Sequence, residues 1–136
     1  MNNIHSYFLE IEDKLNTFPL TISSESKIER IDTYKGYLKT KTTFVDGSEL
    51  HLFQFTEIEN HGPVIEKYRY HYQDKNGELI KRWDNAKHHP DLDTFPDHVH
   101  VGGKVKGSDR PDIEGLLEDI AHHIREMSPT FHDYDE

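Results

Sequence analysis

The feature that most constrains the fold is a series of tight-turn sequences placed between segments of alternating hydrophobicity. Asp46-Gly47 is a dipeptide typical of a two-residue β-hairpin, and it separates residues 37–45 from residues 48–58. Two further turn sequences follow, Asn60-His61-Gly62-Pro63 and Asp74-Lys75-Asn76-Gly77. Because strands joined by short turns usually pair as neighbours, the pattern predicts an antiparallel meander. The expected strands are 27–34, 37–45, 48–58, 64–73 and 78–84.

Amphipathic helices are predicted on both sides of this meander. Residues 3–16 carry apolar side chains at helical spacing, and a longer apolar stripe starts at Ile113. Ser108 or Asp109 is the expected N-cap of the second helix, and Ser128-Pro129 its expected end. Since each stripe must be buried against another element, we predict an α+β fold. It would have four to five antiparallel strands, both helices packed on one face, and Lys and Arg side chains on the other.

Length and charge suggest one domain with acidic ends. A chain of 136 residues fits a single domain, 1–136, and its acidic tail, 129–136, is expected to be flexible. Residues 1–25 carry −3 and residues 112–136 carry −7, which together give the net charge of −10. An acidic chain argues against nucleic-acid binding, because phosphate contacts supply much of that affinity. The neutral middle of the chain weakens this objection.

Composition also limits the chemistry and the location. The chain has no cysteine, which excludes disulfides, thiolate metal sites and thiol catalysis. It contains no apolar run of about 20 residues that would suit a membrane span. Its first residues lack the basic and apolar regions of a signal peptide. We therefore expect a cytoplasmic protein that does not interact with a membrane.

The strongest functional signal is the polar segment from Lys81 to His100. It contains four histidines, two prolines and little apolar surface, so core burial alone cannot hold it. Binding and catalytic residues concentrate in such loops, and histidine is the side chain that ordinarily titrates near neutral pH. His98 and His100 are two residues apart, so in an extended segment both point the same way. Three interpretations of this segment compete.

The first interpretation is a metal site. His98 and His100 would be ligands, with His88 or His89 as the third, and the segment supplies carboxylates at Asp91, Asp93 and Asp97. Three protein ligands and a water form a catalytic zinc site, and histidine with carboxylate also suits manganese. The candidate cofactor is therefore a divalent metal, zinc or manganese. The spacing matches no established metal motif such as His-Glu-x-x-His.

The second interpretation is metal-free cleavage of RNA. Attack by a 2′-hydroxyl needs a base, an acid and cations for the charge that develops on phosphorus. His88, His89, His98 and His100 are the candidate catalytic residues. Candidates for binding the substrate comprise cations, a strand histidine and surfaces on which a base could stack. They are Arg82, Lys104, His71 and Tyr72, with Lys87, Trp83 and Phe95 as further candidates.

The third interpretation is structural. Asp84 and Asn85 would cap and turn the chain and so orient the loop, while the histidines would hydrogen-bond its backbone. Gly102 and Gly103 are expected to form a turn. Two cationic rows on the strands, Lys39 with Lys41 and Lys67 with Arg69 and His71, are typical of solvated strand faces. They gain functional interest if the histidine segment lies over the same face.

The segment resembles a known family. The residues that carry the resemblance are Tyr70-His71-Tyr72-Gln73, Arg82-Trp83-Asp84-Asn85-Ala86, His88-His89-Pro90, Thr94-Phe95-Pro96 and His98-Val99-His100. They are similar to the TumE family, the toxin components of prokaryotic type II toxin–antitoxin pairs. The resemblance implies a growth-inhibiting protein with a cognate antitoxin as its partner. By analogy with other small toxins, it also suggests RNA as the target and endoribonuclease as the activity.

The leading hypothesis is thus a toxin that cleaves RNA at a histidine-rich loop. One alternative is a non-catalytic module whose acidic helices bind a basic protein. Another is a metal-dependent hydrolase that acts on a different substrate.

Overall fold

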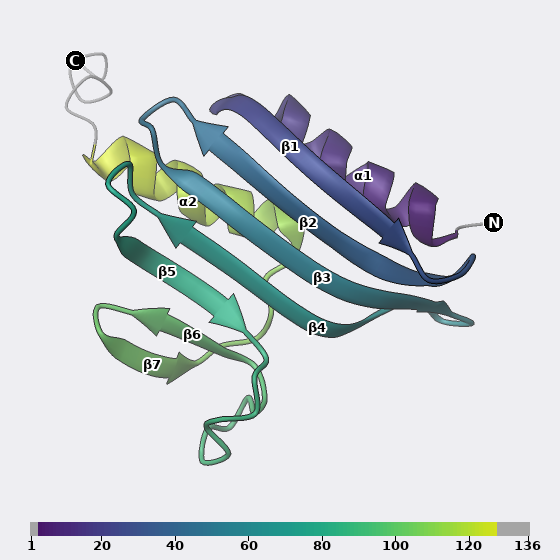
Figure 1. The fold of residues 1–136 in the computed structure, drawn as a ribbon. Helices are drawn as coiled ribbons and strands as arrows, with labels where there is room; N and C mark the ends of the chain where they lie inside the picture. The colour runs from purple at the N-terminus through teal and green to yellow at the C-terminus, as the bar shows by residue number, and fades with distance from the viewer. Residues whose placement is uncertain (1–2, 128–136) are drawn as a thin grey trace.

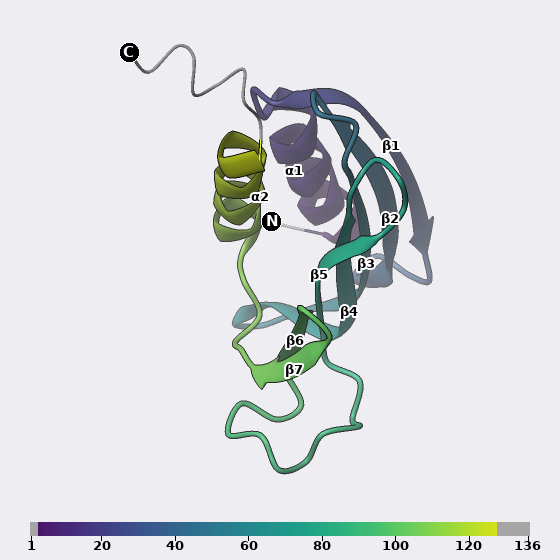
Figure 2. The same ribbon diagram turned by 90° about the vertical axis from the view of Figure 1, so that its left-hand side faces the viewer.

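The fold is a curved seven-stranded antiparallel sheet with two helices on one face (Figures 1 and 2). The computed structural model describes residues 3–127. The strands follow one another in the sheet in chain order, from β1 to β7. The predicted α+β meander is confirmed, with seven strands in place of four to five. The elements are α1 Ile4–Thr17, β1 Thr21–Arg30, β2 Lys35–Phe44, β3 Glu49–Glu59, β4 Gly62–Gln73, β5 Leu79–Asp84, β6 His98–Val101, β7 Lys104–Gly107 and α2 Ile113–Met127.

The additional strands are a short hairpin formed by β6 and β7. Each has four residues, too few for hydrophobic alternation to stand out in the sequence. Gly102 and Gly103 connect them with φ angles of 59° and 74°. Positive φ at both central residues is what a tight hairpin turn requires, so the predicted turn at these glycines is confirmed. The hairpin extends the sheet beyond β5 and carries two of the candidate histidines.

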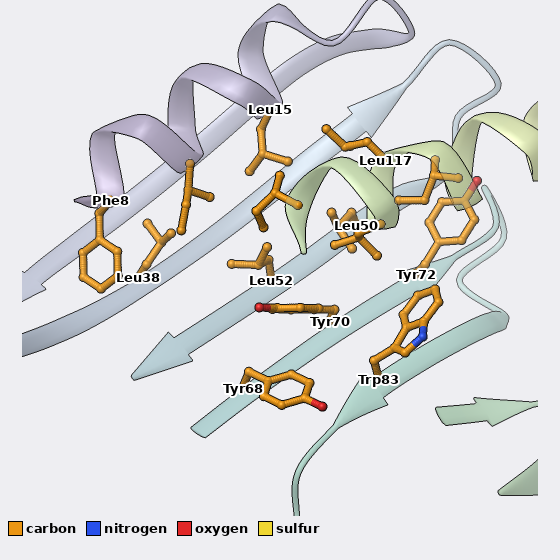
Figure 3. Close-up of a cluster of buried hydrophobic side chains, with 14 of the residues drawn as sticks. Phe8, Leu15, Leu38, Leu50, Leu52, Tyr68, Tyr70, Tyr72, Trp83 and Leu117 are labelled. Atoms are coloured by element: carbon orange, nitrogen blue, oxygen red, sulfur yellow. The ribbon is translucent and has the colours of Figure 1, made fainter. Parts of the chain in front are cut away.

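Alternation along the strands separates a buried face from an open face. Leu38, Leu50 and Leu52 point towards the helices and contribute to the core, together with Tyr70 and Tyr72 (Figure 3). Both helices bury their apolar stripes against this face, which explains why neither stripe is solvated. The helical residues that fill the core are Ile4, Phe8, Ile11, Leu15, Ile113, Leu116, Leu117, Ile120 and Ile124.

Side-chain caps fix where both helices begin. Asn3 accepts a hydrogen bond from the Ser6 N–H at 2.8 Å and caps α1. Asp112 accepts one from the Gly115 N–H at 2.7 Å, so it takes the N-cap role predicted for Ser108 or Asp109. The predicted end of α2 at Ser128-Pro129 and the predicted flexible tail, 129–136, lie outside the described residues. Neither helix, over its described length, is long and apolar enough to cross a membrane.

The open face carries the cationic rows and the histidines together. Lys39 lies opposite Phe53, which lies opposite Arg69. His71 lies opposite Arg82, and Arg82 lies opposite His100. Because residues directly opposite one another in antiparallel strands share a face, the predicted Lys and Arg face and the β6 histidines lie on the same side of the sheet. This arrangement places the candidate site.

Candidate active site

The site forms where β5 and β6 pair. Asp84 lies opposite His98, and Arg82 lies opposite His100. All four side chains therefore project from the open face and line a cavity of about 420 Å³. The other residues that line this cavity are Lys39, Phe53, Lys67, Tyr68, Arg69, Asn85, Ala86 and His88.

The buried carboxylate of Asp84 connects the polar groups of the site. Its Oδ1 lies 2.9 Å from His98 Nε2 and accepts a hydrogen bond from the Ala86 N–H at 3.0 Å. Its Oδ2 lies 3.3 Å from Arg82 Nε and 3.6 Å from His100 Nε2. Burying a charge is costly unless it is paired and hydrogen-bonded, and here one carboxylate meets three side chains and the first turn of the loop. Asp84 thus fixes the positions of Arg82 and His98, and Arg82 in turn contacts His100.

His98 is held on both sides of its ring. Its Nδ1 lies 2.9 Å from the carbonyl oxygen of Pro96, and its Nε2 faces Asp84. A carbonyl and a carboxylate accept hydrogen bonds, so each ring nitrogen of His98 faces an acceptor. The side chain is only 2% exposed. This geometry fixes the ring and leaves it no free nitrogen with which to accept a proton.

His100 has a different environment. Its side chain is 22% exposed, and its Nε2 lies 3.5 Å from Arg82 Nη2. A guanidinium only donates, so in this contact Nε2 can only be the acceptor. Burial lowers the pKa of His100, and the positive charge of Arg82 lowers it further. Both effects favour the unprotonated imidazole, so His100 is suited to accept a proton in the cavity.

His89 completes a cluster of three histidines. Its ring centroid lies 5.0 Å from that of His98 and 6.1 Å from that of His100. Each of the three offers a ring nitrogen, and these atoms lie within 4.8 Å of one another. His88 or His89 was predicted as the third metal ligand, and the structure brings His89 to the cluster. His88 is exposed and lines the outer part of the cavity.

The cluster fits a metal ion only after other contacts are replaced. Both nitrogens of His98 are occupied, by Pro96 and by Asp84. The guanidinium of Arg82 is within 3.5 Å of the nitrogen that His100 would have to offer, and it would repel a divalent ion. A metal would therefore need Asp84 to move into the ligand set and Arg82 to move away.

Hydrogen bonds tie the loop of residues 85–97 to the sheet. Asn85 accepts from the Tyr68 N–H at 3.1 Å and donates to the Glu66 carbonyl at 3.0 Å. The Tyr68 hydroxyl donates to Asp97 Oδ1 at 2.8 Å. Thr94 Oγ1 donates to the Asp97 carbonyl at 2.7 Å. Both ends of the loop are thus fixed, so the backbone that carries His88 and His89 stays beside β6.

Replacing Tyr68 with phenylalanine is expected to loosen this loop. The change removes the donor to Asp97 and is expected to lower the free energy of unfolding by about 1 kcal/mol. Amide hydrogen exchange in residues 86–97 is expected to accelerate, while exchange in the core strands stays slow. Tyr34→Phe is the matched control, because the hydroxyl of this exposed residue has no hydrogen-bond partner among residues 3–127. Equal exchange in both variants would show that the hydroxyl does not anchor the loop.

Several predicted substrate contacts lie elsewhere. Tyr72 is only 1% exposed, and its hydroxyl is 2.8 Å from Ser48 Oγ. It cannot stack on a base, and this prediction is corrected, because Tyr72 points into the core. Trp83 is buried on the same side. Lys104 is exposed but lies opposite Val101, on the other face of β6 and β7 from His100.

His71 is close to the site without lining its cavity. Its ring Nε2 lies 3.1 Å from Gln73 Oε1, and burial lowers the pKa of the imidazole. It is the cross-strand neighbour of Arg82 on the open face. His71 thus flanks the candidate active site on the open face of the sheet.

Phe53 was not identified from the sequence as a residue that lines the cavity, although Lys39, Lys67 and Arg69 were grouped into cationic rows on the strands. The face of the sheet that Phe53 occupies was not worked out. Phe53 alternates with the buried Leu52 and Gln54, and this alternation is the signal that could have placed it on the open face.

Comparison with known proteins gives one family. A family model described as Toxin TumE matches residues 11–128. The matched span includes every strand of the sheet and all residues of the candidate active site. No curated protein and no solved structure gives a significant match.

Proposed function

The chain belongs to the TumE family of toxins, and from this premise we propose that it cleaves RNA at the candidate active site. The observation that carries the proposal is His100, whose pKa is lowered, beside the guanidinium of Arg82 in an open cavity. A base and a cation side by side are what attack by a 2′-hydroxyl on its neighbouring phosphate requires. A TumE toxin is in general paired with an antitoxin, and an RNA target would place this protein in the cytoplasm.

His100 would act as the general base. Once the substrate phosphate draws the Arg82 guanidinium away, Nε2 of His100 would take the proton of the 2′-hydroxyl while the 2′-oxygen forms a bond to phosphorus. The bond from phosphorus to the 5′-oxygen would then break, leaving a 2′,3′-cyclic phosphate on one product. His89, when protonated, would donate a proton to the 5′-oxygen and give the other product a 5′-hydroxyl. The proton taken and the proton given balance over the reaction.

Cations would stabilise the phosphorane. Arg82 is placed to bind the non-bridging oxygens, since its guanidinium faces the same cavity as His100. Lys39, Lys67 and Arg69 line the cavity as well. The net negative charge of the chain does not argue against phosphate binding by these cations. Most of that charge comes from the two ends, which are distant in sequence from the cations.

Asp84 and His98 would act as positioning groups. The carboxylate holds Arg82 through one oxygen and His98 through the other, and Arg82 in turn contacts His100. His98 in turn fixes the start of β6 through the Pro96 carbonyl. We therefore assign His98 a role in holding the site and His100 the direct chemical role.

A metal-dependent hydrolase is the second candidate function. The observation in its favour is the cluster of His89, His98 and His100. The occupied nitrogens of His98 and the nearby Arg82 weigh against it. A metal would supply an activated water, and its loss would abolish the reaction.

Cleavage of total RNA by the purified protein, with and without EDTA, tests the proposal. Cleavage that persists in EDTA and is lost in His100→Ala would support histidine acid–base chemistry. Cleavage that stops in EDTA and returns with zinc or manganese would support the metal-dependent alternative. Intact RNA in every reaction would contradict both candidates.

The pH dependence of cleavage follows from the lowered pKa of His100. An unperturbed histidine has a pKa of about 6.5, and burial and Arg82 place His100 below that value. The base works while it is neutral, so the acidic limb of the rate under single-turnover conditions is expected below about pH 6.5. Arg82→Gln removes one cause of the lowered pKa, so the acidic limb is expected to move to higher pH. An acidic limb that stays in place in this variant would contradict the assignment.

A further inference from the structure

Two smaller hollows continue from the candidate active site along the open face. One has a volume of about 320 Å³ and is lined by residues of β1, β2 and β3. The other has about 210 Å³ and lies over β2, β3 and β4. Lys39 and Phe53 line both hollows and also the main cavity. The three hollows therefore form one continuous surface that leads away from the histidines.

Unpaired cations line this surface. The side chains of Lys39, Lys67 and Arg69 form no hydrogen bond and no ion pair with any of residues 3–127. Other cations of the open face are paired, Lys27 with Glu29 at 3.1 Å and Lys41 with Glu49 at 3.9 Å. A solvated cation that has no partner in its own chain is available to an anionic ligand.

Aromatic side chains lie between these cations. Phe53 has Lys39 opposite it on β2 and Arg69 opposite it on β4. The rings of Tyr37 and Phe55 stack with centroids 4.7 Å apart and an interplanar angle of 18°. The rings of Tyr37 and Phe53 are 5.9 Å apart. All three rings are half-buried on a face that neither α1 nor α2 covers, and the Lys35 ammonium lies 5.2 Å from the centroid of the Phe55 ring.

We propose that this surface binds single-stranded RNA and directs it into the active site, a proposal that rests on the RNA cleavage proposed above. We name it the aromatic–cationic track and define it by Tyr37, Lys39, Phe53, Phe55, Lys67 and Arg69. Single-stranded nucleic acid is bound by cations along its backbone and by aromatic rings under its bases. A duplex keeps its bases stacked on one another, so it cannot use the rings.

The geometry of the sheet links the track to the chemistry. Phe53, Arg69, Asp84 and His98 are successive cross-strand neighbours from β3 to β6. Adjacent strands lie about 4.8 Å apart, so Phe53 is on the order of 10 Å from Asp84. A base on Phe53 would therefore be close to the phosphate at Arg82 and His100. An acidic protein segment could use the cations, but it would have no need of exposed stacked rings.

Binding of a fluorescent 2′-O-methyl oligoribonucleotide, measured by anisotropy, tests the track. The methyl group blocks the nucleophile, so binding is measured without cleavage. Lys39→Ala/Arg69→Ala is expected to weaken binding about tenfold or more at low salt and to flatten the slope of log K against log salt by about 1.4. Lys75→Ala/Arg125→Ala is the matched control, because it removes two exposed cations from a turn and from α2. The control is expected to bind like the wild type.

Phe53→Leu tests the rings separately from the charges. Loss of one stacked base is expected to weaken binding about fivefold or more, and circular dichroism reports whether the half-buried site stays folded. The same oligonucleotide annealed to its complement is expected to bind less tightly. The track would be overturned by equal binding of the single strand and the duplex, or by Phe53→Leu and Lys39→Ala/Arg69→Ala variants that both bind like the control.

The outcome for the track is distinguishable from the outcome for catalysis. Binding that depends on the track without any cleavage of unmodified RNA would retain the track and contradict the proposed reaction. Cleavage together with RNA binding that is unchanged by substitutions in the track would support the proposed reaction and contradict the track.

Discussion

Replacing His100 with alanine is expected to lower the rate of RNA cleavage by about 100- to 10,000-fold, the usual contribution of a general base or acid. The same change should abolish growth arrest when the toxin is expressed without its antitoxin. Its effect on the thermal unfolding midpoint should be small, because His100 is partly exposed and its one close cation, Arg82, also pairs with Asp84. The measurement is single-turnover cleavage beside a thermal melt.

His122→Ala is the matched control for this change. His122 is an exposed histidine on α2, which packs on the covered face of the sheet, so cleavage and growth arrest should persist. A single replacement at position 100 is more informative than a double replacement that includes His98. His98 is buried and hydrogen-bonded on both sides, so its loss would combine folding with catalysis. Cleavage at the wild-type rate in His100→Ala would show that another residue acts as the general base.

Replacing Asp84 with alanine is expected to have the largest effect on stability. Removing one partner of a buried charged pair costs about 3–5 kcal/mol of unfolding free energy, since the remaining groups stay buried without compensation. Here the remaining groups are His98, Arg82 and the Ala86 N–H. The measurement is urea denaturation, and the variant should also be inactive.

Asp84→Asn separates the charge from the shape of this side chain. Its amide oxygen can still accept from the Ala86 N–H, so we expect a smaller loss of stability than in Asp84→Ala, together with nearly complete loss of cleavage. Asp93→Asn, an exposed position on the same loop, should stay within about 0.5 kcal/mol of the wild type. An Asp84→Asn variant that is as stable and as active as the wild type would show that the carboxylate charge does not organise the site.

Local sequence signals predicted the meander and part of the site. Asp46-Gly47 and the later turn sequences specify hairpins through backbone geometry, so the order of the strands followed from them. The spacing of His98 and His100 placed both rings on one side of an extended segment, as β6 shows. Alternation also predicted that the cationic rows would occupy the face opposite the helices.

Other features depend on long-range pairing that the sequence does not encode locally. Asp84 and His98 meet because β5 and β6 pair across the loop of residues 85–97, and no turn signature sets that register. His89, and not His88, reaches the cluster because the loop backbone folds back beside β6. Tyr72 was misplaced although it follows His71 in the strand, because alternation puts neighbouring residues on opposite faces and so places Tyr72 on the face that the helices cover.

The most direct measurement of the central claim is the chemistry of the cleaved ends. RNA is incubated with purified protein in EDTA, and the products are identified by mass spectrometry beside those of His100→Ala. The account predicts 2′,3′-cyclic phosphate and 5′-hydroxyl ends from the wild type and none from the variant. Products with 3′-hydroxyl and 5′-phosphate ends, or RNA that stays intact, would contradict attack by the 2′-hydroxyl with His100 as the base.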